Sequence, residues 1–298
     1  MRNDDLFAPF RRRDACGPMG CHLPLRLKLL ILAQLPFAVA RALLALLLLT
    51  SFSACCLLLC SFPESTQAAL LPPLAAIHAR SALLCFGVWL RAVGTPARSA
   101  AVLVSNHVSW ADILAHVALS APGFVAKESL SRVFLVGAAA RCLRCIFVAR
   151  EAKAGGAATQ VLERLQRAVP GQRPLVLFPE GTTSNGCYLL PFRTGAFIAG
   201  CPVQPVLLSY AYGAFSPAWE TITFARHSLF MLCSWRIRLT VTYLPLHTPS
   251  EAERADAKLF AANVREELLR AGDLRPSAAG LAEKRAFQEE LLAEWAKR

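Results

Sequence analysis

The chain has 298 residues, of which 55% are hydrophobic and 17% charged, and its formal net charge is +12. This composition is too apolar for an ordinary soluble enzyme. The positive charge suits anionic lipid headgroups, phosphate esters or nucleic acid. Because the basic residues are not interleaved with aromatic ones, as on a nucleic-acid platform, we expect no nucleic-acid partner.

The apolar excess is concentrated in residues 29–62, which follow a polar, basic tail of residues 1–28 that we expect to be poorly ordered. Ala42–Phe62 carries no charge, and as a helix rising ~1.5 Å per residue it is long enough to cross a ~30 Å hydrocarbon core. The alternative is a re-entrant hairpin bent near Pro36–Arg41. A single span would place the rest of the chain outside the cytosol. This conflicts with the cytosolic orientation that we expect at the end of this subsection, so we favour the hairpin as the membrane anchor.

The remaining segments alternate between strand-like and helix-like patterns. Ser81–Val93 predicts an amphipathic helix on the membrane surface. Strands are expected at residues 101–105, 124–127, 145–149, 174–178, 203–210 and 236–244, with helices after Ser109, Ser129 and Gly156 and over residues 250–270. This alternation predicts an α/β domain with a buried sheet flanked by helices. Residues 275–298 read as a charged helical tail.

The 11 cysteines do not suggest a disulfide framework, which is typical of shorter, loop-rich secreted chains. We therefore expect reduced thiols. Cys142 and Cys145 have the C-x-x-C spacing of zinc and redox sites, but no second pair with ligand spacing follows, so we expect no metal there.

The first candidate for chemistry is N-H-V-S-W-A-D at residues 106–112, where a predicted strand gives way to a helix. Nucleophilic attack by a hydroxyl group needs a base that removes the hydroxyl proton, and histidine is suited to that task at neutral pH. Asp112 follows His107 by five positions, so its carboxylate can reach back from the first helical turn to the imidazole. Ser109 and Asp112 also match a capping box, which is the purely structural alternative.

The second candidate is F-P-E-G-T-T-S at residues 178–184, which closes a buried strand. Gly181 permits close approach to the backbone, Thr182 offers a hydroxyl and an N–H donor, and Glu180 can orient an acceptor hydroxyl or an arginine. The alternative is a turn with a structural glutamate.

Two cations also end predicted strands. Lys127 closes the strand at residues 124–127, and Arg150 follows the strand at residues 145–149. A guanidinium fixed in such a place can bind a phosphate in bidentate fashion. The alternative is a surface cation whose aliphatic stem covers apolar side chains.

In their order along the chain, N-H-V-S-W-A-D, C-I-F-V-A-R, F-P-E-G-T-T-S and V-Q-P-V resemble the blocks of the glycerolipid (PlsC-like) acyltransferase family. FPEGTTSNG and PFRTGAFIAGCPVQPVLLSY are more similar to the lysophosphatidylcholine and lysophosphatidylethanolamine acyltransferases than to the lysophosphatidic acid branch. The resemblance covers residues 76–274. Arg144 stands where the second block usually begins with glycine, which leaves the backbone course near Arg150 open.

The resemblance implies a PlsC-like α/β fold and an enzyme that moves an acyl group from acyl-CoA to a lysophospholipid. His107 is similar to the catalytic base and Asp112 to its orienting partner, while residues 203–206 match a block that shapes the substrate pocket. The family needs no metal or cofactor, and this chain has no D-x-[DN]-x-[DN]-G calcium loop, so we expect neither. The candidate substrate-binding residues are Asn106, Lys127, Arg150, Glu180, Gly181 and Thr182.

Two alternatives stay open. The first is a lysophosphatidic acid or glycerol-3-phosphate acyltransferase, which the basic stretch from Lys127 to Arg173 favours because a phosphate monoester needs more cationic contacts. The second is a non-catalytic scaffold with the same fold, held at the endoplasmic reticulum or on lipid droplets. For the enzyme we expect a membrane location, at the endoplasmic reticulum, with the catalytic domain facing the cytosol.

Overall fold

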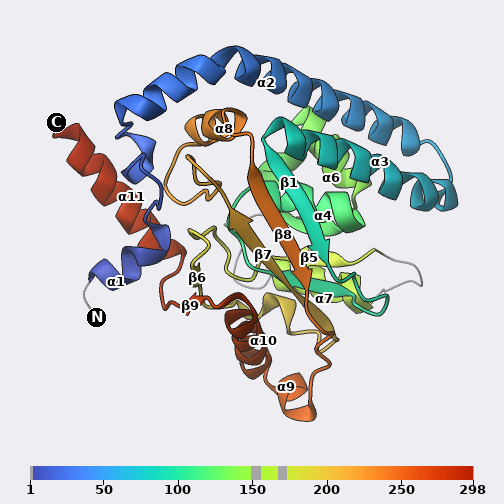
Figure 1. Cartoon of the computed structure of the whole chain (residues 1–298). Helices are drawn as coiled ribbons and strands as arrows, with labels where there is room; N and C mark the ends of the chain where they lie inside the picture. Colours follow the sequence, from blue (N-terminus) through green and yellow to red (C-terminus); the bar gives the residue numbers. More distant parts are fainter. Residues whose placement is uncertain (1–2, 149–155, 167–172, 298) are drawn as a thin grey trace.

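A seven-stranded sheet forms the centre of the protein (Figure 1). The computed structural model describes residues 3–148, 156–166 and 173–297. The strand order is β1-β8-β7-β2-β5-β3-β4; β2, β3, β4, β5 and β7 run parallel, and β8 pairs antiparallel with β7 and parallel with β1. The strands are β1 (Val88–Val93), β2 (Val102–Ser105), β3 (Gly123–Lys127), β4 (Ile146–Val148), β5 (Leu175–Leu177), β7 (Val203–Ala211) and β8 (Ile237–Tyr243). The predicted α/β fold and its six strands are therefore confirmed.

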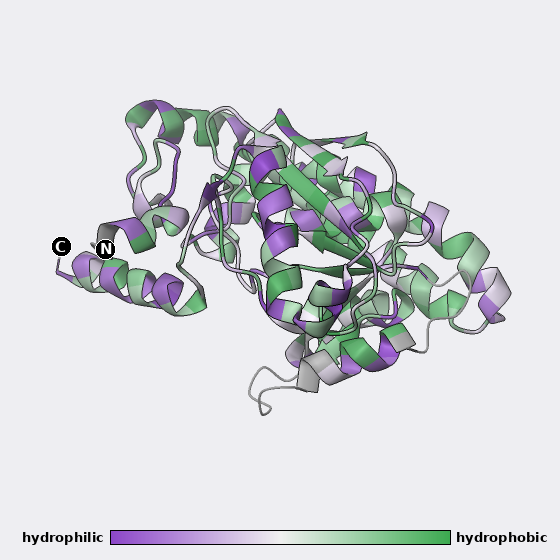
Figure 2. Cartoon of the chain, turned by 90° about the horizontal axis from the view of Figure 1, so that it is seen from below, coloured by the Kyte–Doolittle hydropathy of each residue, from purple (hydrophilic) through white to green (hydrophobic). Residues whose placement is uncertain are grey.

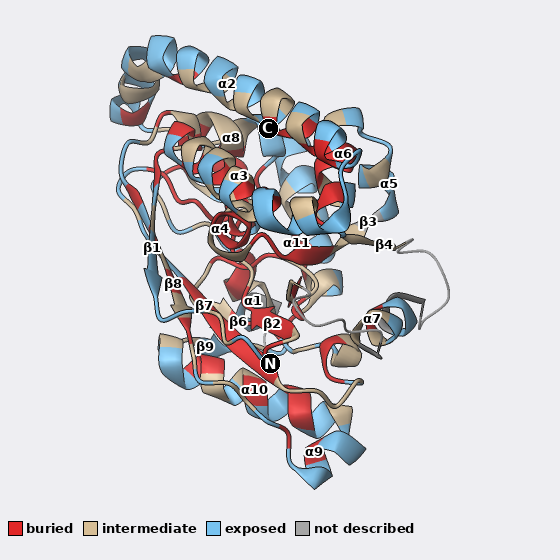
Figure 3. Cartoon of the chain, turned by 90° about the vertical axis from the view of Figure 1, so that its right-hand side faces the viewer, coloured by how far each residue is buried: buried red, intermediate tan, exposed pale blue. Residues whose placement is uncertain are grey.

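Helices cover both faces of this sheet. On one face Leu103 packs in a core shared with α3 (Glu64–Cys85) and α4 (Ala111–Ser120). On the other face Val102 and Val104 pack against Phe260 of α10 (Ala257–Gly272), with α7 (Gly156–Gln166) on the same side. Figure 3 shows the buried central strands between exposed outer helix faces, and Figure 2 shows the same strands as the hydrophobic centre. The alternating pleat thus gives the sheet two apolar faces.

Shorter elements connect this framework. They are α1 (Asn3–Phe7), α5 (Glu128–Ser131), α6 (Phe134–Cys142), α8 (Phe224–Leu232), α9 (Glu251–Ala255) and α11 (Leu281–Ala296), with a small sheet of β6 (Tyr188–Leu189) and β9 (Arg275–Pro276). The single helix predicted over residues 250–270 is two helices, because the side chain of Asp256 accepts a hydrogen bond from the Lys258 N–H and starts α10. The start signal at Ser250 forms a complete capping box.

The expected bend near Pro36–Arg41 is wrong. Residues Leu25–Leu59 form one continuous 35-residue helix, α2, that passes through Pro36. Arg41 is accommodated because its guanidinium faces the protein, where it donates hydrogen bonds to the carbonyls of Leu232 and Ser234 at 2.6 and 2.9 Å and lies over the Trp235 ring. The chain turns after Leu59 instead, and α2 packs against α3 as a helical hairpin.

The α2–α3 hairpin carries the apolar surface of the protein. Both helices are long and apolar enough to cross a membrane, with mean hydropathies of 2.5 and 1.4 in their most apolar windows. Only 22% and 28% of those windows are buried, and the outer face of α2 is exposed along its length (Figure 3). Exposed apolar area on this scale marks an interaction surface, and its composition fits lipid.

The amphipathic helix expected over Ser81–Val93 is also wrong. The helix α3 ends at Cys85, and Val88–Val93 form the edge strand β1, paired with β8 over its whole length. Gly87 separates the two with a φ of +70°, and a Cβ there would lie 2.1 Å from the Ser234 carbonyl oxygen. A glycine that permits this close approach ends the helix.

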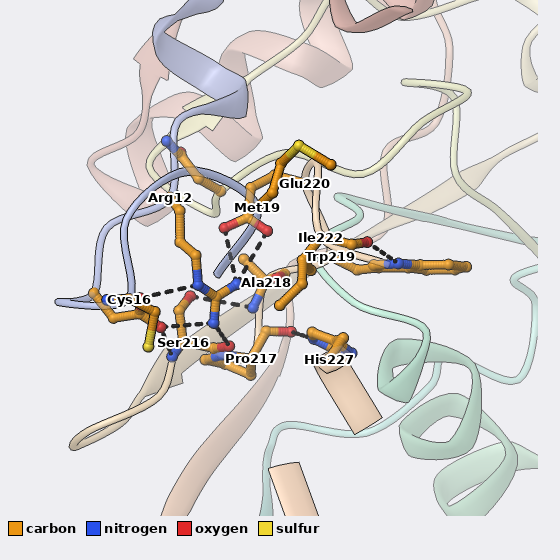
Figure 4. Close-up of polar contacts among 12 residues, drawn as sticks. Arg12, Cys16, Met19, Ser216, Pro217, Ala218, Trp219, Glu220, Ile222 and His227 are labelled. Atoms are coloured by element: carbon orange, nitrogen blue, oxygen red, sulfur yellow. Dashed lines mark hydrogen bonds and ion pairs between the residues drawn. The ribbon is translucent and has the colours of Figure 1, made fainter. Parts of the chain in front are cut away.

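The N-terminal segment is not the poorly ordered tail that its composition predicts. The side chain of Arg12 in this segment is fully buried. Its guanidinium pairs with two carboxylates, Asp14 at 2.6 Å and Glu220 at 3.2 Å (Figure 4). Phe10 packs in a core with Leu190 and with residues of α11. Helix α1 near the N-terminus packs against α11 near the C-terminus (Figure 1), so a segment read as a basic tail is part of the folded domain.

Candidate active site

The two predicted motifs meet because the strands that precede them are neighbours. Val104 near the end of β2 is in register with Leu177 at the end of β5, and the two strands are parallel. Residues 106–112 and 178–184 therefore emerge at the same edge of the sheet. On the other side of β2 lies β7, which continues past this edge to Ala211.

His107 and Asp112 form a hydrogen-bonded pair. The imidazole Nδ1 lies 2.9 Å from Asp112 Oδ2, and the histidine side chain is 18% exposed while the aspartate is fully buried. A carboxylate partner places the proton on Nδ1 and leaves the Nε2 lone pair as the base. Among the described residues, none hydrogen-bonds to Nε2. The ring stacks on Phe178, with centroids 4.1 Å apart and an interplanar angle of 17°.

Asp112 is held by further donors. Its Oδ2 accepts the backbone N–H of Val108 at 2.7 Å and of Ser109 at 2.9 Å, and its Oδ1 accepts the hydroxyl of Tyr210. The Ser109 bond is the carboxylate half of a capping box. The Asp112 N–H donates to the Ser109 carbonyl at 3.1 Å and not to the Ser109 hydroxyl, so the box is not complete. Sequence reasoning missed Tyr210 as a site residue. The residue lies in the predicted strand 203–210, but only the pairing of β7 with β2 brings its hydroxyl to Asp112.

Glu180 is turned inward. It is 2% exposed, and its two carboxylate oxygens accept the backbone N–H of His107 at 2.7 Å and of Leu190 at 2.9 Å. Burial raises the pKa of Glu180 to about 8, although these two hydrogen bonds oppose the shift. This geometry positions the backbone of His107, which matches the structural alternative for this glutamate.

The side chain of Asn106 also forms hydrogen bonds with the backbone, in this case that of β7. Its side chain donates to the Leu208 carbonyl at 3.0 Å and accepts the Leu208 N–H at 2.7 Å, so both of its polar atoms extend the contact between β2 and β7. At 3% exposure it is buried among these partners. The structure thus places Asn106 next to the His107–Asp112 pair, where it joins β2 to β7.

Gly181 and Thr182 lie in the loop after Glu180, and the structure adds a cation there. Gly181 has a φ of +69°, and a Cβ on it would lie 2.8 Å from Arg193 Cζ. The exposed guanidinium of Arg193 therefore packs directly on this glycine, while Thr182 is half-buried. Sequence reasoning missed Arg193 as a site residue, although it lies in the quoted stretch PFRTGAF.

Of the remaining two predicted residues, only Lys127 lies in the described part of the chain. Lys127 ends β3, which β5 separates from β2, so its backbone lies at the same sheet edge but two strands away. Arg150 lies outside the described residues.

Two buried histidines line the inner side of the site. His116 of α4 is fully buried, its ring meets Phe178 edge-on at 5.8 Å, and neither ring nitrogen has a partner among the described residues. His227 of α8 accepts a hydrogen bond from Trp110 Nε1 and donates one to the Pro217 carbonyl, both at 2.9 Å. Burial lowers the pKa of each to about 4, so both are neutral at pH 7.

We predict that acid unfolds the protein through these two histidines. Their unfolded pKa of about 6.5 exceeds the folded value of about 4, so the unfolded chain binds more protons in this window. The stability each contributes is present above pH 6.5 and is lost as the pH falls towards 4, by at most about 1.4 kcal/mol per pH unit. Thermal unfolding in detergent micelles should show His116→Leu less destabilised between pH 7 and pH 5 than wild type. The exposed His22, changed to leucine, is the control; equal acid sensitivity of all three would contradict the prediction.

Comparison with known proteins identifies a domain in the chain. Residues 92–209 match the family model named Acyltransferase, so this part of the chain is a PlsC-like acyltransferase domain. It is 48% identical over 201 residues to lysophospholipid acyltransferase LPEAT1 of Arabidopsis thaliana, and 35% identical over 189 residues to a lysophosphatidylcholine acyltransferase of Drosophila melanogaster. These matches cover 66% and 62% of this chain, but only 50% and 35% of the relatives.

The fold is similar to that of a solved structure. The 1-acyl-sn-glycerophosphate acyltransferase PlsC of Thermotoga maritima superposes with a TM-score of 0.57 at 20% identity, covering 81% of this chain and 95% of that one. The expected PlsC-like fold is therefore confirmed. At this identity the likeness concerns the architecture alone.

Proposed function

We propose that this chain transfers an acyl group from acyl-CoA to the free hydroxyl of a lysophospholipid, with lysophosphatidylcholine or lysophosphatidylethanolamine as the acceptor. The observation that carries the proposal is the His107–Asp112 pair, 2.9 Å apart, with Nε2 free of partners among the described residues. The names of the Arabidopsis and Drosophila relatives support the acceptor class.

The mechanism follows from this pair. Nε2 of His107 takes the proton of the acceptor hydroxyl as its oxygen attacks the thioester carbonyl carbon. The carbon–sulfur bond then breaks, and the imidazolium returns the proton to the CoA thiolate. Asp112 keeps the proton on Nδ1 and stabilises the imidazolium while it exists. No metal or bound cofactor takes part in this scheme, in which acyl-CoA is a substrate.

A membrane location fits this reaction. The α2–α3 hairpin carries the exposed apolar surface, and a lysophospholipid and a long-chain acyl-CoA both partition into lipid. A hairpin whose two helices both enter the bilayer brings the chain back to the side from which it came. We therefore place the catalytic domain on the cytosolic face, where acyl-CoA is available, at the endoplasmic reticulum.

A second candidate acceptor is lysophosphatidic acid. The observation that favours it is Arg193, whose guanidinium packs on Gly181 beside the catalytic pair and is exposed to an incoming phosphate. A phosphate monoester would gain more from this cation than a zwitterionic headgroup does.

The test is CoA release by membranes that contain the wild type or His107→Ala, over a panel of acyl-CoAs and lysophospholipids. We expect transfer by the wild type, with a choline or ethanolamine acceptor preferred, and only background with His107→Ala. A preference for lysophosphatidic acid would shift the assignment to the second candidate. Absence of transfer by a folded wild type across the panel would reject the enzyme in favour of a scaffold.

A further inference from the structure

A buried lysine from the C-terminal helix reaches the loop that follows Glu180. Lys284 of α11 is 7% exposed and lies outside the residues that match the family model. Its ammonium donates to the Thr183 carbonyl at 2.9 Å, to Thr183 Oγ1 at 2.7 Å and to the Trp219 carbonyl at 3.2 Å. These three acceptors use all three N–H bonds of an ammonium group.

Two of these contacts lie close to the backbone of the proposed catalytic histidine and of its neighbour Val108. The Thr183 carbonyl and the Ser184 N–H belong to the same peptide group, and that N–H donates to the His107 carbonyl at 3.0 Å. Trp219 in turn donates its N–H to the Val108 carbonyl at 2.8 Å. Because hydrogen bonds in a chain polarise one another, a positive charge at Lys284 strengthens the link that runs through the Thr183–Ser184 peptide group.

The charges around Lys284 are balanced. Glu220 and Glu180 face it and favour its charged form, and Arg12 pairs with Glu220 at 3.2 Å. The Phe10 ring lies 5.9 Å from the ammonium. Burial outweighs the carboxylates and lowers the pKa of Lys284 to about 8, so the charge is lost within a pH range that enzyme assays reach.

We propose that Lys284 is a positioning residue for acyl transfer: its three hydrogen bonds hold the loops of residues 181–187 and 216–222 against the backbone of His107 and Val108. The inference rests on the proposed function, because it states how that same site is kept in register. A neutral amine has only two N–H donors and cannot serve all three acceptors. Loss of the proton therefore loosens both loops.

Three variants of the full chain in detergent micelles test this. Lys284→Met should lower kcat about 10- to 100-fold, as expected for a misplaced catalytic group, with less than about a threefold change in KM for acyl-CoA. The adjacent, exposed Arg285 is the matched control, and Arg285→Met should keep wild-type kcat. Lys284→Arg, which stays charged, should restore most of the activity at pH 7. It should also lack the decline above pH 8 that the wild type shows.

Hydrogen–deuterium exchange separates this inference from the proposed function. In Lys284→Met, and in the wild type as the pH rises from 7 to 9, the amides of Ser184 and Trp219 should exchange faster, after correction for intrinsic rates. If the wild type shows no transfer activity, the proposed function is rejected. The exchange measurement still tests whether Lys284 holds the two loops in place. Wild-type kcat and exchange in Lys284→Met would overturn the positioning role. So would a loss of kcat that only follows a smaller folded fraction.

If Lys284→Met does not fold, Thr183→Val takes its place. This change removes one of the three acceptors and also the hydrogen bond that the Thr183 hydroxyl donates to the Trp219 carbonyl, and it keeps both carbonyls. We expect a several-fold lower kcat and faster exchange at Ser184, and unchanged values of both would overturn the proposal.

Discussion

Asp112→Asn should lower kcat by about three to four orders of magnitude while the protein stays folded. The effect is expected on this scale because the same change in a serine protease triad costs about 10⁴. An amide at position 112 carries no charge to stabilise the imidazolium of His107. If its NH2 group faces Nδ1, it also forces the proton onto Nε2 and removes the base. Initial rates of CoA release, with the folded fraction measured in parallel, give the result.

Asp256→Asn is the matched control for this prediction. Asp256 caps α10 through a hydrogen bond from the Lys258 N–H at 2.8 Å, and α10 lies on the sheet face opposite α4. The Asp256→Asn variant should lose about 1 kcal/mol or less of stability and keep the kcat of the wild type. If Asp112→Asn behaved in the same way, the capping interpretation of Asp112 would suffice and the catalytic one would be wrong.

Arg12→Met should lower the free energy of unfolding by about 3–5 kcal/mol, which is the range for breaking a buried ion pair by removing one partner. The side chains of Arg12 and Glu220 are 0% exposed and that of Asp14 is 2% exposed, so the change leaves two buried carboxylates without their cation. Burial already raises the pKa of Glu220, although Arg12 opposes this shift. Unfolding in detergent micelles measures the loss.

Two further variants make this result interpretable. Arg13→Met removes the same charge from an exposed neighbour and should cost less than about 1 kcal/mol. Adding Glu220→Gln to Arg12→Met removes one of the unpaired charges and should recover part of the loss. Equal stabilities of Arg12→Met and Arg13→Met would show that the ion pair does not hold the N-terminal segment in place.

The parts of the site that lie close together in sequence were predictable. A histidine and an aspartate five residues apart, at the end of a strand, determine their own contact. FPEG lies alongside because β5 is next to β2 in the sheet, although β3 and β4 come between them in the chain. The composition of the anchor was predicted but its shape was not. Arg41 was read as a break in the helix, whereas it bonds to carbonyls that are distant in sequence, at Leu84, Leu232 and Ser234.

The supports of the site were not predictable from local patterns. Arg12 and Glu220 are 208 residues apart, and Lys284 and Thr183 are 101 apart, so neither pairing leaves a mark in any short window. A basic N-terminal segment and a charged C-terminal helix have the composition of solvated tails. Only the fold shows that each provides one buried cation.

The stacking of Phe7 on Phe287, with ring centroids 4.9 Å apart, ties the two ends of the chain to each other. The stretch that marks the family, residues 92–209, is therefore shorter than the unit that folds. A fragment trimmed to residues 76–274 would keep every recognisable motif and lose both Arg12 and Lys284. Expression of such a fragment should yield a molecule with the complete signature and an unsupported reaction centre.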